Sequence, residues 1–342
     1  MAATVGSDAI RYFKDVLNEI SSKQKIDLFL YSRGGEINAP LPLVNLIRNH
    51  CEEFSVLVPY RAHSAATLIC LGADKIIMNE MGQLSPIDPT TGNVFNPIDP
   101  SNPTGRWPIS VEDVSNYLSL ASEKAKLVTE ESLKDVFHLL SEKVHPIALG
   151  NVHRIYNLIR LLAPKLLSLH MDCSSVTEKA KIKAIVDTLT EKLYTHEYLI
   201  SREEAKEIGL KIIYPEPILD KLMWNLYKQY ERELKLLDPF NPIQIVQAPL
   251  QPKASQQQSV NQGTPLPICK HQEQCAFLES RNMSYALTTD IEIYPPPTLQ
   301  QIVSMINPQI VSQIITQLVQ VVQQLNLVPP TVKFTSQQWL SI

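Results

Sequence analysis

Short apolar runs alternate with helical patterns along the N-terminal quarter of this chain. Residues 26–31, 55–59 and 75–79 are apolar runs with the length of a buried strand, whereas residues 41–49 predict a short helix. An earlier helix begins at Ser7, whose hydroxyl is the expected N-cap. This order of strands and helices predicts an α/β fold.

Two turns between these elements carry candidate chemistry. Gly34 and Gly35 follow the first strand, and paired glycines let backbone N–H groups point at a ligand. Ser64 follows the second strand and stands at the head of a helix of small residues that starts with Ala65. A serine there lies near unpaired N–H groups and the positive end of the helix dipole, which favour an oxyanion. Taken alone, Ser64 is more often only an N-cap.

The order of these parts supplies the stronger signal, because several short segments recur together. The chain resembles the ClpP/SppA class of serine peptidases and, within it, the serine dehydrogenase proteinase family, over about residues 7–215. Within this range, residues 62–89 are the most specific part of the resemblance. The matching segments are Ser32–Gly35, Val58–Pro59, Ala62–Thr67, Ala73–Met78 and Leu84–Pro89, then Thr195–His196, Ile200, Glu204–Ala205 and Gly209–Leu210.

The resemblance implies a crotonase-like fold of stacked ββα units and a Ser-Asp-His triad. Carried onto this sequence, the triad is Ser64, Asp88 and His196, with an oxyanion hole built from N–H groups of Gly34, Gly35 and Ala65. Without the resemblance, Asp88 would be interpreted as a turn residue in the sequence Pro-Ile-Asp-Pro, bonding its own backbone. His196 precedes a short helix, residues 202–208, that a capping box and a terminal glycine define.

The base is the least certain member of this set, since SppA relatives use a lysine in its place. Residues 110–170 are helical throughout and form an insert that is expected to cover the sheet or to build an oligomer contact. This insert contains the alternative bases Lys124, Lys126 and His145. Each of these side chains, considered singly, is more often a solvated or structural residue than a catalytic one.

The composition changes after a charged amphipathic helix at residues 220–237. We therefore expect a peptidase-like domain at 1–240, shortened at its start, and a linker rich in Pro and Gln at 241–268. The C-terminal region, 269–342, contains an uncharged stretch at 308–328 with heptad-like apolar spacing, which predicts a self-association or partner helix.

That C-terminal region also contains Cys269, His271 and Cys275. Their spacing matches no common zinc site and a fourth ligand is not evident, so we predict neither a metal nor a cofactor. The five cysteines of the chain are too sparse and odd in number for a disulfide framework.

Size and charge narrow the class of protein further. With 342 residues, 44% of them hydrophobic, the chain can bury one large core and carry a smaller region beside it. The net charge of −4, without a Lys/Arg run, argues against a nucleic-acid partner. No stretch of 18 uncharged apolar residues occurs, so no transmembrane segment is predicted. We expect a cytoplasmic protein, with peripheral association at a membrane left open.

The favoured function is a serine endopeptidase that acts on peptides or unfolded proteins and forms a homo-oligomer. Two alternatives stay open. A crotonase-type acyl-CoA enzyme would use a similar oxyanion hole, but with acidic residues in place of the serine. A non-catalytic scaffold with the same fold would explain Arg33 where the class usually has proline, Ala66 where it usually has glycine, and the short N-terminus.

Overall fold

The computed structural model describes residues 4–20, 25–100, 102–238, 240–241, 269–294 and 331–341. The chain divides into two compact units. One comprises Met1–Tyr230 with Leu278–Met283, and the other comprises Glu231–Phe277 with Ser284–Ile342. The predicted linker, apart from Asn241, and the predicted helix at 308–328 lie outside the described residues.

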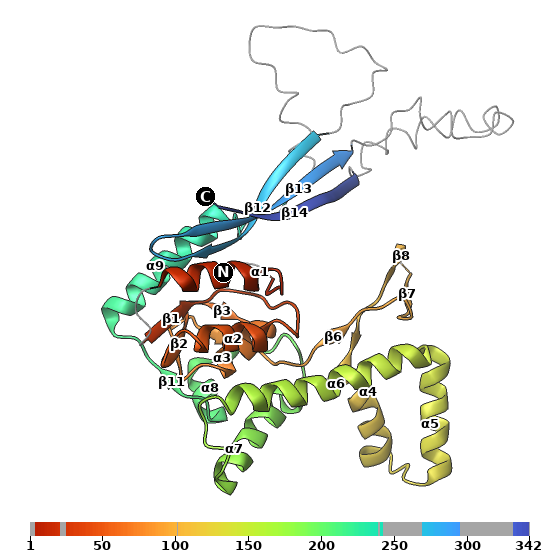
Figure 1. Ribbon diagram of the computed structural model, residues 1–342. Coiled ribbons are helices and arrows are strands. Elements are labelled where there is room, and N and C mark those ends of the chain that lie inside the picture. The colour runs from red at the N-terminus through yellow and green to blue at the C-terminus, as the bar shows by residue number, and fades with distance from the viewer. Residues whose placement is uncertain are drawn as a thin grey trace, which may run out of the picture. The chain divides into compact units, whose positions relative to one another are not determined.

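A parallel sheet of four strands forms the centre of the first unit (Figure 1). Its order is β1-β2-β4-β11, and each neighbouring pair is parallel. The predicted α/β class is thereby confirmed, and three of the expected strands lie within two residues of their predicted bounds. The strands are β1 (Lys25–Phe29), β2 (Glu53–Val58), β4 (Lys75–Met78) and β11 (Ile212–Ile213).

Three helices of the N-terminal part pack in sequence order against one another, and the middle one also contacts β2 of this sheet. They are α1 (Ala9–Glu19), α2 (Pro40–Arg48) and α3 (Ala65–Leu71), and every residue of α3 is buried. The prediction of Ser7 as the cap of α1 is wrong. Asp8 occupies the N-cap position, and the N–H of Ser7 instead donates to Glu36 Oε2 at 3.1 Å.

A second, smaller sheet lies between the loops that carry the candidate site. Its order is β10-β5-β3, with β5 (Gln83–Leu84) in the middle, β3 (Arg61–Ala62) parallel to it and β10 (Ile200–Ser201) antiparallel to it. The helix that follows β10 is α8 (Arg202–Ile208), as predicted. Because these strands come from distant parts of the chain, the sheet brings three loops to one place.

The helical insert is confirmed between the two sequence halves of the site. It begins after two short strand pairs and ends with a long helix, α6, whose one end packs against α3. Figure 1 shows α4 and α5 beside the other end of α6, away from the parallel sheet. The strand pairs are β6 (Thr90–Thr91) with β9 (Ile109–Ser110), and β7 (Ile98–Asp99) with β8 (Asn102–Arg106). The helices of the insert are α4 (Val111–Ser119), η1 (Leu120–Lys124), α5 (Glu130–Lys143) and α6 (Pro146–Leu167). They are followed by α7 (Val176–Asp187) and η2 (Thr188–Lys192).

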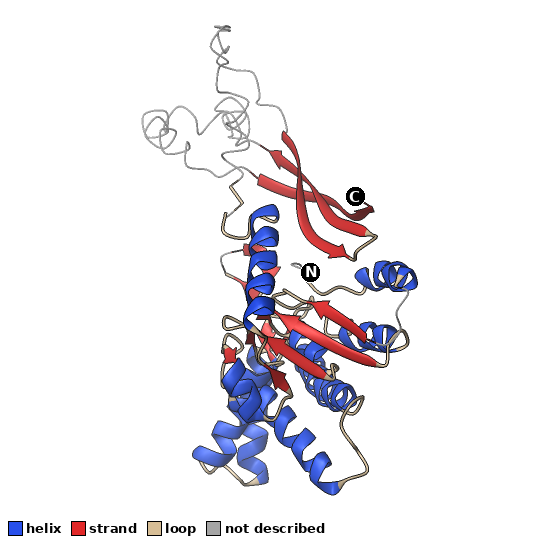
Figure 2. Ribbon diagram, turned by 90° about the vertical axis from the view of Figure 1, so that its left-hand side faces the viewer, coloured by secondary structure: helices blue, strands red, loops and turns tan. Residues whose placement is uncertain are grey.

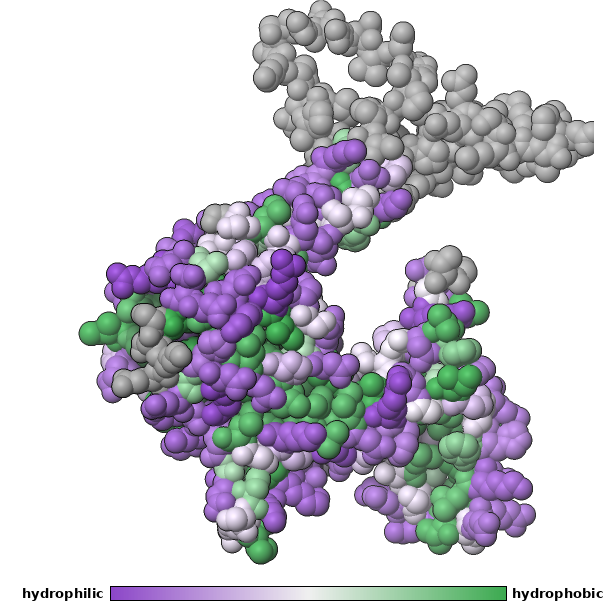
Figure 3. All heavy atoms as spheres, in the orientation of Figure 1, coloured by the Kyte–Doolittle hydropathy of each residue, from purple (hydrophilic) through white to green (hydrophobic). Residues whose placement is uncertain are grey.

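The outer part of this insert exposes apolar side chains. Figure 3 shows hydrophobic residues gathered over the lobe formed by α4 and α5. An open pocket of about 390 Å³ lies between α4, α5 and α6, and it is lined by apolar side chains such as Leu118, Phe137 and Leu149. Phe137 is 56% exposed, which is unusual for so large an apolar side chain. This face is therefore open to a further apolar surface.

The first unit closes with α9 (Pro217–Glu233), which begins and ends a few residues earlier than the predicted helix. Tyr227 anchors it: the side chain is 2% exposed, and its ring centroid lies 5.0 Å from Tyr31 and 5.4 Å from Tyr60. Such aromatic pairs stabilise beyond the area they bury. None of the helices in the described part of the chain is long and apolar enough to span a bilayer.

The second unit is built on a sheet that the sequence patterns did not predict (Figure 2). Its strands are β12 (Cys269–Glu279), β13 (Ser284–Tyr294) and β14 (Thr331–Ser341), in that order, with β13 antiparallel to β14. Ile291 and Ile293 form its small buried core, with Cys269 and Val332 packed against them.

Candidate active site

Ser64 stands at the N-cap position of α3 in a strained backbone conformation. Its φ is 53° and its ψ is −115°, outside the regions that residues other than glycine commonly occupy. Such strain costs about 1–3 kcal/mol and persists only where the surroundings enforce it. The Ser64 side chain makes no capping hydrogen bond to the helix. The structure thus argues against an N-cap as the reason for a serine at this position.

A buried hydroxyl pair holds the backbone of this turn. Ser64 N–H donates to Ser85 Oγ at 2.8 Å, and Ser85 Oγ donates to the carbonyl of Pro86 at 3.0 Å. Thr67 Oγ1 donates to the carbonyl of Ala62 at 2.7 Å and accepts from Ser85 N–H at 3.2 Å. Sequence reasoning missed the roles of Thr67 and Ser85, although both stand within the segments that carry the resemblance.

The Gly-Gly turn places the bare backbone of Gly34 against Ser64 and that of Gly35 against Val5. Their φ angles are +115° and +153°, and a Cβ on Gly34 would lie 2.9 Å from Ser64 Cβ. A Cβ on Gly35 would lie 2.2 Å from the carbonyl oxygen of Val5. Only glycine fits either position without displacing a neighbour, because real Cβ atoms do not approach other heavy atoms so closely.

The three predicted oxyanion donors differ in their availability. Gly34 N–H already donates to Ser32 Oγ at 3.1 Å. Val5 N–H donates to the Gly34 carbonyl at 2.6 Å and Glu36 N–H to the Val5 carbonyl at 2.7 Å, a bridge that leaves the N–H of Gly35 on the opposite side. Among the described residues, the N–H groups of Gly35 and Ala65 have no acceptor. Two of the three donors are therefore free to bind a ligand.

Asp88 and His196, 108 residues apart in the sequence, form a hydrogen-bonded pair. His196 Nδ1 lies 3.1 Å from Asp88 Oδ1, and Asp88 is only 7% exposed. Because a carboxylate can only accept, Nδ1 carries the proton and Nε2 is left with a lone pair. The hydrogen bond to Asp88 raises the pKa of His196 above its ordinary value, against the opposing effect of burial.

Ser64 and His196 line one cavity of about 360 Å³, together with Gly35. Asp88 is not part of the lining, so it contacts the cavity only through the imidazole. The remaining lining residues are Ile37, Pro89, Thr90, Thr91, Gly92, Asn151, Arg154 and Ile155. The structure thus brings Ser64, Asp88, His196 and the Gly-Gly turn together at a concave surface.

His63 is a titratable neighbour of this site that the sequence analysis did not identify. Burial, and then the charges of Arg61 and Arg33, lower the pKa of His63 to about 4. Its Nε2 is buried and has no hydrogen-bond partner among the described residues. His63 is therefore neutral near pH 7.

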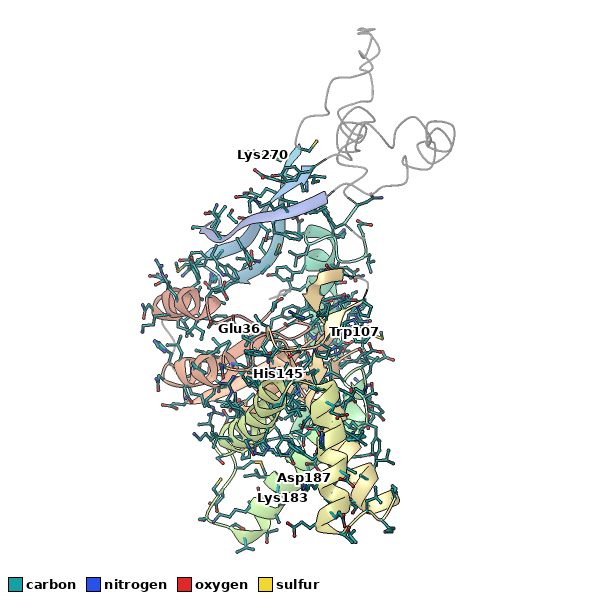
Figure 4. The ribbon with its side chains drawn as sticks, turned by 90° about the vertical axis from the view of Figure 1, so that its right-hand side faces the viewer. Glu36, Trp107, His145, Lys183, Asp187 and Lys270 are labelled. Carbon is teal, nitrogen blue, oxygen red and sulfur yellow. The ribbon has the colours of Figure 1, made fainter. Side chains whose placement is uncertain are left out.

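The three alternative bases lie elsewhere. Lys124 and Lys126 are exposed, at the end of η1 and in the loop that follows. His145, labelled in Figure 4, caps the start of α6. Its ring stacks on Phe95 with centroids 4.8 Å apart. None of the three lines the cavity that contains Ser64.

The cysteine and histidine residues of the C-terminal region lie along β12. His271 Nε2 lies 2.6 Å from Glu273 Oε1, and Cys275 Sγ lies 3.2 Å from Thr289 Oγ1. Within the described ranges, no group of three His, Cys, Asp or Glu side chains is placed to hold a metal ion. The expectation of no metal at these residues stays a prediction.

Comparison with known proteins supports the resemblance found in the sequence. The family model described as ClpP-like SDH-type serine proteinase matches residues 9–146, which confirms the resemblance over that range. Ser64 and Asp88 lie inside the matched range, and His196 lies beyond it.

Two relatives come from Methanocaldococcus jannaschii. Uncharacterized protein MJ0137 is 28% identical over 64% of this chain and 65% of its own length, and uncharacterized protein MJ1495 is 23% identical over 56% and 58%. The chain thus spans less than two thirds of either relative. Among solved structures, a serine-to-alanine mutant of the 1510-N membrane-bound stomatin-specific protease matches 65% of this chain and 81% of its own, at 15% identity and a TM-score of 0.37.

Proposed function

We propose that this protein is a serine peptidase in which Ser64 is the nucleophile, His196 the general base and Asp88 the residue that orients it. One observation carries the proposal. Ser64, in its strained conformation, shares a cavity with His196, and the Nδ1 of His196 is hydrogen-bonded to the buried carboxylate of Asp88. Serine requires such a base because its free hydroxyl is scarcely ionised near neutral pH.

The chemistry follows from the protonation states. Ser64 Oγ attacks the carbonyl carbon of the scissile peptide bond while His196 Nε2 accepts the hydroxyl proton. The imidazolium that forms is stabilised by Asp88 and then donates its proton to the leaving amine. Water then attacks the resulting acyl-enzyme while His196 accepts a proton from it. His196 returns this proton to Ser64 Oγ as the second product leaves.

The oxyanion of each tetrahedral intermediate would be held by the N–H groups of Gly35 and Ala65. Both lack an acceptor among the described residues, and Ala65 begins α3, where the helix dipole adds positive potential. Gly34 contributes by close approach to Ser64, since its own N–H is occupied by Ser32.

The two residues that depart from the family pattern do not block this site. Neither Arg33 nor Ala66 lines the cavity, and Ala66 is buried with its N–H bonded to the His63 carbonyl at 2.9 Å. The scaffold alternative therefore finds no support in these two substitutions.

The decisive experiment is labelling with a fluorophosphonate probe, which reacts with an activated serine. Wild-type protein should be labelled, whereas Ser64→Ala and His196→Ala should not be. Ser174→Ala, which removes an exposed hydroxyl that does not line the cavity, is the matched control and should be labelled like wild type. Equal labelling of wild type and Ser64→Ala would refute the proposal.

A homo-oligomer remains part of the proposal. The exposed apolar side chains over α4 and α5 would be covered by a second copy, which would remove them from water. Light scattering of the full chain at micromolar concentration should give a mass above the 38.6 kDa of one copy. A monomer mass that is independent of concentration would contradict this part of the proposal without affecting the chemistry.

A further inference from the structure

The lining of the cavity that contains Ser64 carries one permanent charge. Of its lining residues, Arg154 is the only one with a permanent charge, and none is a carboxylate. His196, the other titratable lining group, is paired with Asp88, whose buried carboxylate lies outside the lining. Arg154 is therefore the charged group that a negatively charged ligand would meet directly in this cavity.

Two arginines on α6 show what distinguishes Arg154. Arg160 is held by Glu112 at 3.2 Å and Glu191 at 2.6 Å, and its guanidinium stacks on Tyr156. These contacts give Arg160 a structural role. Arg154 forms no ion pair with any described residue.

Within the described part of the chain, one hydrogen bond orients the Arg154 side chain without neutralising its charge. Its Nη2 donates to Asn151 Oδ1 at 2.6 Å, and Asn151 also lines the cavity. A neutral amide leaves the positive charge intact, and it occupies only one of the five N–H donors of a guanidinium. The Arg154 side chain is solvent-exposed, and an exposed arginine often serves only as a solvated surface charge. Its place in the lining of the cavity that contains Ser64 and its anchoring by Asn151 favour a role in binding.

We propose that Arg154 determines substrate choice by binding a carboxylate of the peptide, an inference that rests on the proposed peptidase function. A guanidinium matches a carboxylate with two parallel hydrogen bonds, which fixes position as well as charge. The carboxylate belongs either to an acidic side chain near the scissile bond or to the C-terminus of the peptide. If Arg154 binds an acidic side chain, the enzyme is an endopeptidase with a preference for acidic residues. If Arg154 binds the C-terminal carboxylate, the enzyme removes residues from the chain end.

Binding to a variant that cannot hydrolyse separates recognition from catalysis. The probes are fluorescein-labelled, alanine-rich octapeptides in which one Glu, Gln or Lys is moved through each position, each made as the free acid and as the C-terminal amide. Fluorescence anisotropy measures their affinity for Ser64→Ala and for Ser64→Ala combined with Arg154→Ala.

For an acidic side chain, one position should show Glu binding about 10-fold or more tightly than Gln in Ser64→Ala, the size expected of a hydrogen bond to a charged group. If Arg154 binds the chain terminus, the free-acid peptide should bind about 10-fold more tightly than its C-terminal amide, wherever the Glu stands in the peptide. Arg154→Ala should abolish the preference for the carboxylate. Arg154→Glu should reverse the preference among side chains, so that the Lys peptides bind more tightly than the Glu peptides. Lys165→Ala removes the same charge from an exposed position of α6 outside the cavity and should leave it unchanged.

Equal affinity across the series, or absence of binding to every peptide, would overturn the inference. So would a preference that persists in the Arg154→Ala background. Fluorophosphonate labelling of otherwise wild-type protein tests the peptidase function separately. Failure of labelling together with an Arg154-dependent carboxylate preference would refute the catalysis and leave the binding site in place.

Discussion

Gly34→Ala tests whether the Gly-Gly turn holds the nucleophile in its reactive geometry. The backbone at Gly34 has a φ of +115°, and an added Cβ would lie 2.9 Å from Ser64 Cβ and 3.4 Å from Ser64 Oγ. Nothing else in the chain needs to change for this methyl group to act on the serine. The substitution is therefore a direct mechanical perturbation of the proposed nucleophile.

The magnitude follows from two effects. A residue with a side chain at this φ carries a strain of about 1–3 kcal/mol, which lowers the free energy of unfolding by that amount. Two carbon atoms prefer a separation of about 3.5–4.0 Å, so the turn or Ser64 has to move by roughly 0.5–1 Å. A displacement of about 1 Å at a reacting group can cost about 100-fold in rate.

We therefore expect Gly34→Ala to fold with a lowered Tm and to react with a fluorophosphonate about 100-fold more slowly than wild type. Gly92→Ala is the matched control, because Gly92 lines the same cavity and a Cβ there meets no atom within 4 Å. It should label at the wild-type rate. Circular dichroism and thermal denaturation, measured on both variants, separate unfolding from misplacement of the serine.

A folded Gly34→Ala protein that labels as fast as wild type would refute this reasoning. It would mean that Ser64 is held by the strained turn and the hydroxyl of Ser85 alone, and that the close approach of Gly34 has no catalytic consequence. Slow labelling of Gly92→Ala as well would point to a general sensitivity of the cavity instead.

Four further outcomes are expected. His196→Ala should lower turnover by about 10³-fold or more, whereas Lys124→Ala should retain activity; the opposite pattern, in peptide hydrolysis, would favour a Ser-Lys dyad. The labelling rate should rise with pH as His196 loses its proton, with a midpoint above the ordinary histidine value of 6.5 because Asp88 raises the pKa. Asp88→Asn should move that midpoint to lower pH and slow the reaction, and an unchanged pH profile would exclude the pair. Ser85→Ala should cost about 1–3 kcal/mol in thermal denaturation, because it leaves a partly buried N–H unpaired, and stability equal to wild type would contradict that role.

The elements that could be predicted from the sequence are those with local signals. The helix α8 is an example: Ser201 Oγ accepts from Glu204 N–H at 3.2 Å, and Gly209 ends the helix at a φ of 110°. Capping residues act within a few positions of one another, so the signal is complete in the local sequence. The buried strands were predictable for a similar reason, since each is a short apolar run.

The first strand of the C-terminal sheet, β12, lacked such a signal. In β12 the exposure alternates along Cys269–Cys275, but the residues there are Cys, Lys, His, Gln and Glu, which show no alternation of apolar and polar types. The roles of His63 and Ser85 were hidden for a different reason. Each depends on neighbours that only the folded chain supplies, namely Arg61 and Arg33 for the pKa of His63 and Ser64 for Ser85.

The assembly of the site depends on one register that no local pattern contains. In the small sheet, Leu84 pairs with Ala62 on one side and with Ile200 on the other, and all three residues are buried. β3 runs parallel to β5, so both strands leave the sheet at the same end. β10 runs antiparallel to β5, so the chain enters β10 at that end.

The three proposed catalytic residues follow from this arrangement. Ser64 comes two residues after the end of β3, Asp88 four residues after the end of β5, and His196 four residues before the start of β10. Each therefore emerges at the same end of the sheet, which is why a pair 108 residues apart meets at 3.1 Å. The motifs could identify the three loops from the sequence, but only the pairing of β5 with both neighbours makes them one site. A one-residue slip in either pairing would turn the side chains of that strand to the opposite face and separate the triad.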